Sequence, residues 1–372
     1  MAGIYIHIPF CKKACHYCNF HFSTSKKSIP QLINAIAKEA EIQKRFINET
    51  VETVYFGGGT PSILDVNDVE KILSSIYKNY SVSSIAEITL EANPDDVSET
   101  SLLAWKAIGI NRISLGIQSF IEEELVWMNR SHNASQALKS VELIQEYFNN
   151  YSLDLIFGSP LLISDLWRNN IQQALAFQPP HLSCYALTIE EKTVFGNWLA
   201  NNKMDAINQE HQAEQFEILM LELEAQGYHH YEISNYAKPG FESKHNSSYW
   251  QGKTYLGLGP SAHSYNGKSR FWNVANNAMY ISGIENKTCI MEVENLSLEQ
   301  QFNEYVMISL RTSAGINEDF VKKNWNDKTY QHLQFKIQKW LKTNHLKRNI
   351  HYLALTKKGK LFADGIAADF FV

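Results

Sequence analysis

Residues 1–190 alternate between short runs rich in β-branched side chains and longer stretches in which apolar positions recur at helical spacing. The short runs predict six strands, at Ile4–Ile8, Thr53–Phe56, Glu87–Glu91, Arg112–Ile117, Leu153–Phe157 and Leu182–Leu187. The longer stretches predict helices, at Ile29–Arg45, Val66–Lys78, Ser98–Ala107, Ser135–Tyr147 and Ser164–Leu175. Strands that alternate with helices indicate an α/β fold whose parallel sheet is covered on its outer face. Because six such units fall short of the eight that close a barrel, we expect an incomplete (β/α)6 parallel barrel.

The rest of the chain predicts two further parts. A long helix at Gln209–Gln226 ends the barrel core, which we place at residues 1–225. Residues 227–275 are rich in Gly, His, Tyr and Trp and show little periodicity, so we expect a connecting segment at 226–295. Residues 296–372 predict a helical module with a hairpin signal, "HLKRNIHYLALTKKG", similar to a small winged helix. Since this module has no concentrated basic recognition helix, we expect an interaction or lid role and not DNA binding.

Composition limits the classes of function. The 372 residues carry a net charge of −5, which argues against a general nucleic-acid binder. No apolar run approaches the roughly 20 residues that cross a bilayer, and "MAGIYIHIPF" lacks the basic start and the cleavage site of a signal peptide. We therefore expect a cytoplasmic protein, in which clustered cysteines bind metal more often than they form disulfides.

Three of the five cysteines lie in one loop after the first predicted strand, within "IPFCKKACHYCNF". The C-x3-C-x2-C spacing brings Cys11, Cys15 and Cys18 near one centre. A structural zinc ion would need a fourth ligand, and nearby histidines could supply it, namely His7, His16 and His21. An iron–sulfur cube normally uses four thiolates, so three leave one iron open to a small ligand. The spacing favours the cube, whereas Cys184 and Cys289 lie far away and are interpreted as buried or incidental thiols.

Distinctive residues also gather at the carboxyl ends of the predicted strands, where parallel βα folds bind ligands. The second strand runs into "GGGTPS" at Gly57–Ser62, where glycine lets the backbone approach a ligand closely. The polar side chains at or just past the other strand ends are Glu91, Gln118, Arg130 and Asp154. Singly, such features are more often a turn, a cap or a salt bridge, but together they predict a site. "GLGPSAH", from Gly257, has histidine where a dinucleotide fingerprint needs glycine, and we set it aside.

The cysteine spacing, with the aromatic Tyr17 just before the third cysteine, resembles the radical S-adenosylmethionine (SAM) superfamily. This resemblance implies a [4Fe–4S] cluster on the three cysteines, SAM on the open iron, and an electron donor for the cluster. It implies that Gly58, Gly59 and Thr60 bind the methionine part of SAM. It also implies that polar residues bind the ribose and carboxylate of SAM, namely Glu91, Gln118, Arg130 and Asp154, of which Arg130 is expected within a helix.

A narrower resemblance covers nearly the whole chain. Tyr5, "HIPFC", "GGGTP", "RISLGIQSF" and "DLIFGSP" are together similar to the branch that contains oxygen-independent coproporphyrinogen III dehydrogenase. This similarity places Tyr5 among the cofactor-binding residues. The dehydrogenase carries a further cysteine two residues after the third, where this chain has Phe20. We interpret that difference as a mark of the relatives in the branch that are not dehydrogenases.

Those relatives are heme chaperones with a His-Asn-x-x-Tyr-Trp motif, which here is "HNSSYW" at His245–Trp250. The resemblance implies bound heme, with His245 as a candidate axial ligand and Tyr249 and Trp250 as flat apolar surface. Without it, His245 would more often be a loop histidine beside core aromatics. We expect heme transfer to an unidentified acceptor protein, with no catalytic residue assigned and with peripheral membrane contact left open. The alternatives are oxidative decarboxylation of coproporphyrinogen III and a zinc-stabilised scaffold.

Overall fold

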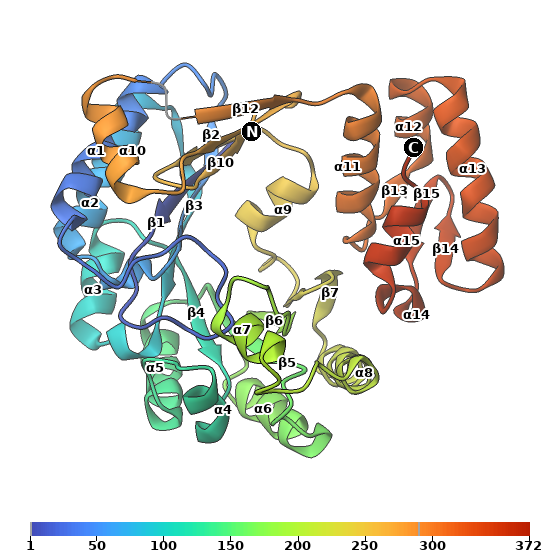
Figure 1. Ribbon diagram of the computed structural model, residues 1–372, viewed down its shortest axis with the longest axis horizontal. Helices are drawn as coiled ribbons and strands as arrows, with labels where there is room; N and C mark the ends of the chain where they lie inside the picture. Colours follow the sequence, from blue (N-terminus) through green and yellow to red (C-terminus); the bar gives the residue numbers. More distant parts are fainter. Residues whose placement is uncertain (1, 289–290) are drawn as a thin grey trace.

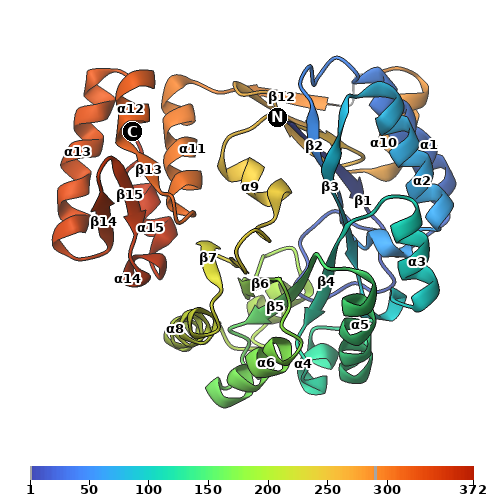
Figure 2. The ribbon, with the colours of Figure 1, turned by 180° about the vertical axis from the view of Figure 1, so that it is seen from behind.

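The alternating pattern of the first 190 residues forms six neighbouring parallel strands with helices on their outer face (Figures 1 and 2). The computed structural model describes residues 2–288 and 291–372. The strands are β1 (Ala2–Ile8), β2 (Val51–Gly58), β3 (Val82–Ala92), β4 (Arg112–Gln118), β5 (Tyr151–Phe157) and β6 (His181–Ala186). The helices of this part are α1 (Ile29–Ile42), α2 (Val66–Asn79), α3 (Glu99–Ala107), α4 (Glu122–Trp127), α5 (Ala134–Tyr147), α6 (Ser164–Ala176), α7 (Val194–Ala200) and α8 (Gln209–Ala225). The predicted α/β fold is therefore confirmed.

Burial explains why these segments adopt the predicted elements. In β1 every residue except Tyr5 is buried, as expected for a parallel strand covered on both faces. Helix α2 buries only the apolar stripe that faces the sheet, namely Val69, Ile72, Leu73 and Ile76. Its first turn is capped by the Asp65 carboxylate, which accepts a hydrogen bond from the Asn67 N–H. One continuous apolar core forms between the sheet and its helices.

Residues 227–295 extend the sheet at both edges, which the sequence pattern does not predict. Beyond β6 lie β8 (Asn235–Ala237) and β7 (His229–Glu232), and beyond β1 lie β9 (Tyr255–Leu258), β10 (His263–Tyr265), β11 (Ser269–Asn273) and β12 (Met291–Asn295). Strand β9 runs parallel to β1, and the other added strands pair antiparallel. The helices α9 (Lys244–Trp250) and α10 (Asn277–Glu285) lie between these strands in the chain.

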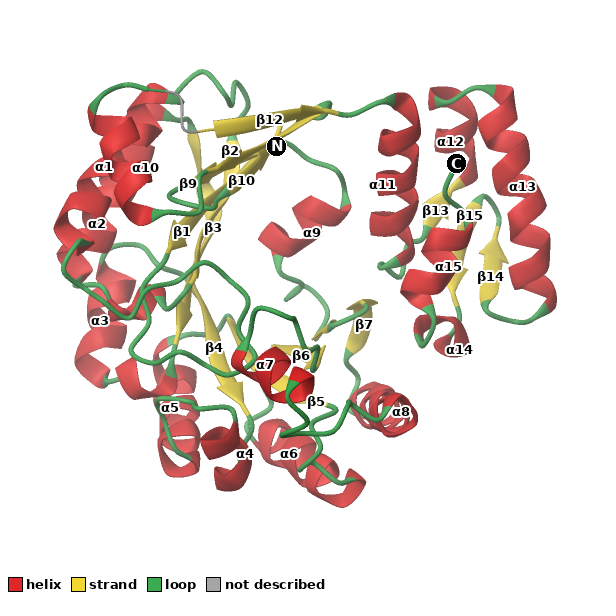
Figure 3. Ribbon diagram, viewed as in Figure 1, coloured by secondary structure: helices red, strands yellow, loops and turns green. Residues whose placement is uncertain are grey.

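The last part of the chain forms a module with its own apolar core, beside the open side of the barrel (Figure 3). Its helices are α11 (Leu298–Leu310), α12 (Glu318–Asn324), α13 (Asp327–Lys342), α14 (Lys357–Lys360) and α15 (Ala363–Asp369). The predicted hairpin is present as β14 (Leu346–Asn349) and β15 (Tyr352–Leu355), and β13 (Ile316–Asn317) pairs with β15. Helix α9 lies between the sheet and α11 (Figures 1 and 2). None of the helices within the described residues combines the length and the apolar character that a membrane crossing requires.

Candidate functional site

The three clustered cysteines lie in the loop after β1, at the carboxyl edge of the parallel sheet. Backbone hydrogen bonds hold this loop in a compact shape. The Cys11 N–H donates to the Ser23 carbonyl at 3.1 Å, and the Cys18 N–H donates to the Cys15 carbonyl at 3.2 Å. All three thiols are partly exposed and line one cavity of about 590 Å³. We call it the cluster cavity.

The cluster cavity also collects the residues that the sequence assigned to SAM. Its wall contains Gly58, Gly59, Thr60, Glu91, Gln118, Arg130 and Asp154. The residues at the ends of β2, β3 and β4 meet there because these strands are parallel neighbours, whose carboxyl ends lie along one edge. Asp154 instead reaches the cavity from the middle of β5. The predicted convergence is thus observed, while the role of each residue toward a cofactor remains a prediction.

Two polar groups contact the thiols. The Thr60 hydroxyl donates to Cys11 Sγ at 3.6 Å, and Arg130 Nη1 donates to Cys15 Sγ at 3.4 Å. Burial raises the pKa of the Cys11 thiol to about 11, so a metal must displace its proton on binding. The Arg130 charge would then offset part of the charge of the thiolates. The donor set therefore suits an iron–sulfur cluster.

Within residues 2–288 and 291–372, no group of three His, Cys, Asp or Glu side chains is placed to hold a single ion. A cube spreads its thiolates more widely, because each binds a different iron. The assignment of an iron–sulfur cluster to these cysteines therefore rests on the C-x3-C-x2-C spacing.

The glycine turn after β2 packs directly against the cysteine loop. Gly58 has a φ of +110°, which favours glycine, and a Cβ on Gly59 would lie 2.8 Å from the Ile8 and Phe10 carbonyl oxygens. The Gly59 N–H donates to Ile8 at 2.9 Å, and the Thr60 N–H donates to Phe10 at 2.8 Å. These N–H groups are therefore bound within the protein. The glycines are needed for close packing, and the Thr60 hydroxyl remains in contact with the Cys11 thiol.

Two half-buried carboxyl groups line the cluster cavity. Glu91, in β3, accepts hydrogen bonds from the Tyr55 hydroxyl at 2.8 Å and from the Gly58 N–H at 3.2 Å. Burial raises the pKa of Glu91 to about 7. Asp154, in β5, accepts a hydrogen bond from the Ser114 hydroxyl at 3.0 Å, and burial raises its pKa as well. Both groups can accept hydrogen bonds from hydroxyl or ammonium groups of a ligand.

Gln118 and Arg130 complete the rim. Gln118 ends β4 with a φ of +67°, a costly conformation for a residue other than glycine. The expectation that Arg130 lies in a helix is wrong, because α4 ends before it and α5 begins after it. In this turn the guanidinium donates to the Gly116 carbonyl and to Asn93 Oδ1, both at 2.8 Å, and to the Tyr17 hydroxyl at 3.0 Å. Tertiary contacts therefore fix Arg130 beside the cysteine loop.

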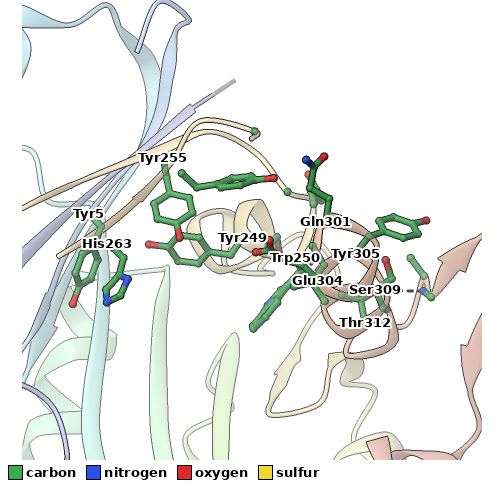
Figure 4. A pocket seen from close by; sticks show the side chains of 18 of the residues that line it. Tyr5, Tyr249, Trp250, Tyr255, His263, Gln301, Glu304, Tyr305, Ser309 and Thr312 are labelled. Carbon is green, nitrogen blue, oxygen red and sulfur yellow. Dashed lines mark hydrogen bonds between the residues drawn. The ribbon is translucent and has the colours of Figure 1, made fainter. Parts of the chain in front are cut away.

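A second cavity, of about 1210 Å³, lies between the sheet, α9 and the C-terminal module (Figure 4). Aromatic side chains form much of its wall, namely Tyr5, Phe20, Tyr231, Tyr249, Trp250, Tyr255, Tyr265, Tyr305, Phe320 and Trp325. We call it the aromatic cavity. Tyr5 lines this cavity and not the cluster cavity, while Gln301, Glu304 and Tyr305 reach it from α11.

The two cavities share part of one wall. Asn19 and Phe20, directly after Cys18, line both of them. The Phe20 side chain is 71% exposed, although it is a large apolar group. The residue that stands where the dehydrogenases have a cysteine therefore lies between the cluster cavity and the aromatic cavity.

His245 is placed differently from what an iron ligand requires. It is 1% exposed, its Nδ1 shares a hydrogen bond with Thr53 Oγ1 at 2.8 Å, and its Nε2 shares one with the Tyr249 hydroxyl at 2.8 Å. The ring also stacks on Tyr55 at 4.9 Å between ring centres. Burial lowers the pKa of His245 to about 3. In this conformation both ring nitrogens are used, so iron ligation by His245 would require these contacts to break.

Sequence reasoning missed part of the aromatic cavity. The stretch "GLGPSAH", set aside above, forms the end of β9 and the turn into β10 and places His263 in the cavity wall. The cavity-lining residues of α11 were missed as well, because the pattern predicts only that α11 is helical. The richness of residues 227–275 in Gly, His and Tyr was the available signal. Cys184 is buried as expected, and Cys289 lies outside the described residues.

Comparison with known proteins agrees with this geometry. Residues 5–167 match the family described as the radical SAM superfamily. The heme chaperone HemW of Bacillus subtilis is 35% identical and aligns over 100% of this chain and 99% of its own. HemW of Synechocystis is 35% identical over 84% of this chain and 78% of its own. The structure of HemN, the coproporphyrinogen III oxidase of Escherichia coli, has a TM-score of 0.85 at 20% identity and covers 100% of this chain and 90% of its own. The chain therefore belongs to the HemW family of radical SAM proteins.

Proposed function

We propose that this protein is a heme chaperone, which binds heme in the aromatic cavity and passes it to an acceptor protein. Relatives that align over most or all of the chain carry this function in their names. The observation that carries the proposal is the aromatic cavity of about 1210 Å³. Its volume exceeds the roughly 300–1,000 Å³ of common small-molecule pockets, and its aromatic wall suits a flat, largely apolar porphyrin.

The charges around the aromatic cavity support one orientation of the heme. Among the described residues that line it there is no lysine or arginine, and the acidic Glu304 is paired with Arg270 at 2.6 Å. The heme carboxylates would thus find no cation inside. Burying them unpaired would be costly, so we infer that the apolar edge of the porphyrin enters first and the carboxylates stay in water.

The cluster cavity supports the proposal that the chain carries both cofactors of its superfamily. Cys11, Cys15 and Cys18 would hold a [4Fe–4S] cluster, and the residues of the cavity wall described above would bind SAM. When bound, this pair supplies one-electron chemistry. Arg130 would offset the charge of the thiolates, and Asn19 and Phe20 separate this site from the aromatic cavity.

The proposal includes two partner proteins and a location. An electron donor would reduce the cluster, and a separate acceptor would take the heme. The C-terminal module, which supplies α11 to the wall of the aromatic cavity, is the part that must move or be contacted when heme leaves on that side. We place the protein in the cytoplasm, because reduced thiols persist there and remain able to bind iron.

A second candidate function is oxidative decarboxylation of coproporphyrinogen III. The likeness in fold to the Escherichia coli oxidase favours it, while Phe20 at the position of the dehydrogenases' extra cysteine opposes it. The test uses the full chain, reconstituted with iron and sulfide without oxygen. Hemin titration measures heme uptake, and a separate reaction with coproporphyrinogen III, SAM and a reductant measures turnover. We expect stoichiometric heme binding without turnover, and turnover without heme binding would establish the second function instead.

A further inference from the structure

Three histidines line the aromatic cavity, and they differ in whether a ring nitrogen is available to iron. They are His7, His21 and His263. The His7 ring is 4% exposed; its Nε2 bonds to the His21 carbonyl at 2.9 Å, and its Nδ1 lies 3.3 Å from the Tyr5 hydroxyl. His21 Nε2 bonds to Asn277 Oδ1 at 2.8 Å, which leaves only Nδ1. Nδ1 lies on the side of the ring nearer the residue's own backbone and is therefore more crowded for a porphyrin than Nε2.

His263 is the histidine of this wall with both ring nitrogens available. It lies in β10, its side chain is exposed, and its ring makes no hydrogen bond to another described residue. The ring is held by stacking against Trp272, across the β10–β11 pair, at 6.1 Å between ring centres. Figure 4 shows the imidazole beside Tyr5, at the sheet side of the cavity. Partial burial of the ring and the charge of Arg270 lower the pKa of His263, which favours the neutral form of the ring.

His245 meets the same cavity only through other residues, Tyr249 and Tyr5. Its Nε2 holds the Tyr249 hydroxyl at 2.8 Å, and the Tyr249 ring lies edge-on to Tyr255 at 4.5 Å. Both tyrosines line the cavity, whereas His245 does not. Loss of the imidazole would therefore disturb the aromatic wall without removing an iron ligand.

We propose that His263 is the axial ligand of the heme iron, and that His245 is a positioning residue that fixes Tyr249 against the porphyrin. The proposal rests on the proposed function, since it identifies the ligand within the same cavity. It predicts that replacement of either histidine weakens heme binding, but that only replacement of His263 shifts the Soret band of the bound heme.

The test is a hemin titration of the full, cluster-loaded chain, read by the dissociation constant and by the position of the Soret band. Loss of a group that only supports a metal ligand weakens metal binding about 10–100-fold. Loss of the ligand itself should cost at least as much, so His263→Ala should weaken heme binding at least about tenfold. It should also shift the Soret band, and added imidazole should restore the band. His245→Ala and Tyr249→Phe should weaken binding with the Soret band at the wild-type position. His229→Ala, in the exposed part of β7, is the matched control and should change neither readout.

Each outcome decides the question. A wild-type Soret band in His263→Ala, or a shifted band in His245→Ala or His21→Ala that imidazole restores, would overturn the assignment. If His263→Ala fails to fold, as shown by loss of the iron–sulfur absorbance, His263→Gln keeps a polar side chain of similar size and gives the same test. If the wild-type protein takes up no heme, the proposed function fails. If it takes up heme and His263→Gln behaves as wild type, only the ligand assignment fails.

Discussion

Thr53→Val should destabilise the protein because it removes one of the two hydrogen bonds that hold the ring of His245. Thr53 and His245 are 3% and 1% exposed, and their side chains share a hydrogen bond of 2.8 Å. Valine has nearly the shape of threonine, so packing is kept while His245 Nδ1 loses its partner. Leaving a buried polar group unpaired costs about 1–3 kcal/mol. We therefore expect the free energy of unfolding to fall by about that amount.

The adjacent strand offers a matched control. Thr89, in β3, is fully buried, and its hydroxyl has no hydrogen-bond partner within the described residues. Thr89→Val makes the same chemical change where no bond exists, and removing an unsatisfied buried hydroxyl should be neutral or stabilising. Urea unfolding of both variants, followed by far-UV circular dichroism, gives the two free energies when the slopes are equal. If the two variants unfold at the same urea concentration, the anchoring of His245 by Thr53 is refuted.

Three further predictions concern the cluster, the glycine turn and the pH dependence of stability. Cys11→Ala, Cys15→Ala and Cys18→Ala should each abolish the broad absorbance of the reconstituted [4Fe–4S] centre. Cys184→Ala should keep that absorbance, and an equal loss there would show that a cluster ligand has been misplaced. Gly59→Ala places a Cβ within 2.8 Å of two carbonyl oxygens, so the free energy of unfolding should fall by about 1–3 kcal/mol. SAM binding, measured by equilibrium dialysis, should weaken as well. Unchanged SAM binding would contradict the close packing of this turn. Burial raises the pKa of Glu39 from 4.5 to about 7, so the native state binds this proton more tightly than the unfolded state does. The resulting contribution to the free energy of unfolding is fully present below pH 4.5 and is lost as the pH rises through 7. Glu39→Gln should flatten the stability curve over that interval in urea unfolding, and an unchanged slope would contradict it.

The local pattern of the chain was sufficient for the barrel core and for much of the cluster cavity. Short runs rich in β-branched side chains, separated by amphipathic stretches, predict β1 to β6 because a parallel strand must bury both faces. The parallel arrangement then brings all the strand ends to one edge, so Glu91, Gln118 and Asp154 were predicted to converge without knowledge of any contact. The cysteine spacing is also local, and it predicts the donor set directly.

The tertiary structure alone decided the positions that depend on distant partners. The edge strands have only three to five residues, too few for a periodic pattern, and pairing with the existing sheet edges fixes them. Arg130 leaves the helical pattern because its guanidinium is bound by groups from other loops.

The aromatic cavity depends on such partners throughout. The buried ring of His245 is held by a hydrogen bond to Thr53, 192 residues away in the chain. His263 reaches the cavity only because β10 is added beyond β9. A sequence motif records which side chains are present. Whether an imidazole nitrogen is free or already bonded depends on contacts between residues far apart in the chain, and only the folded structure contains them.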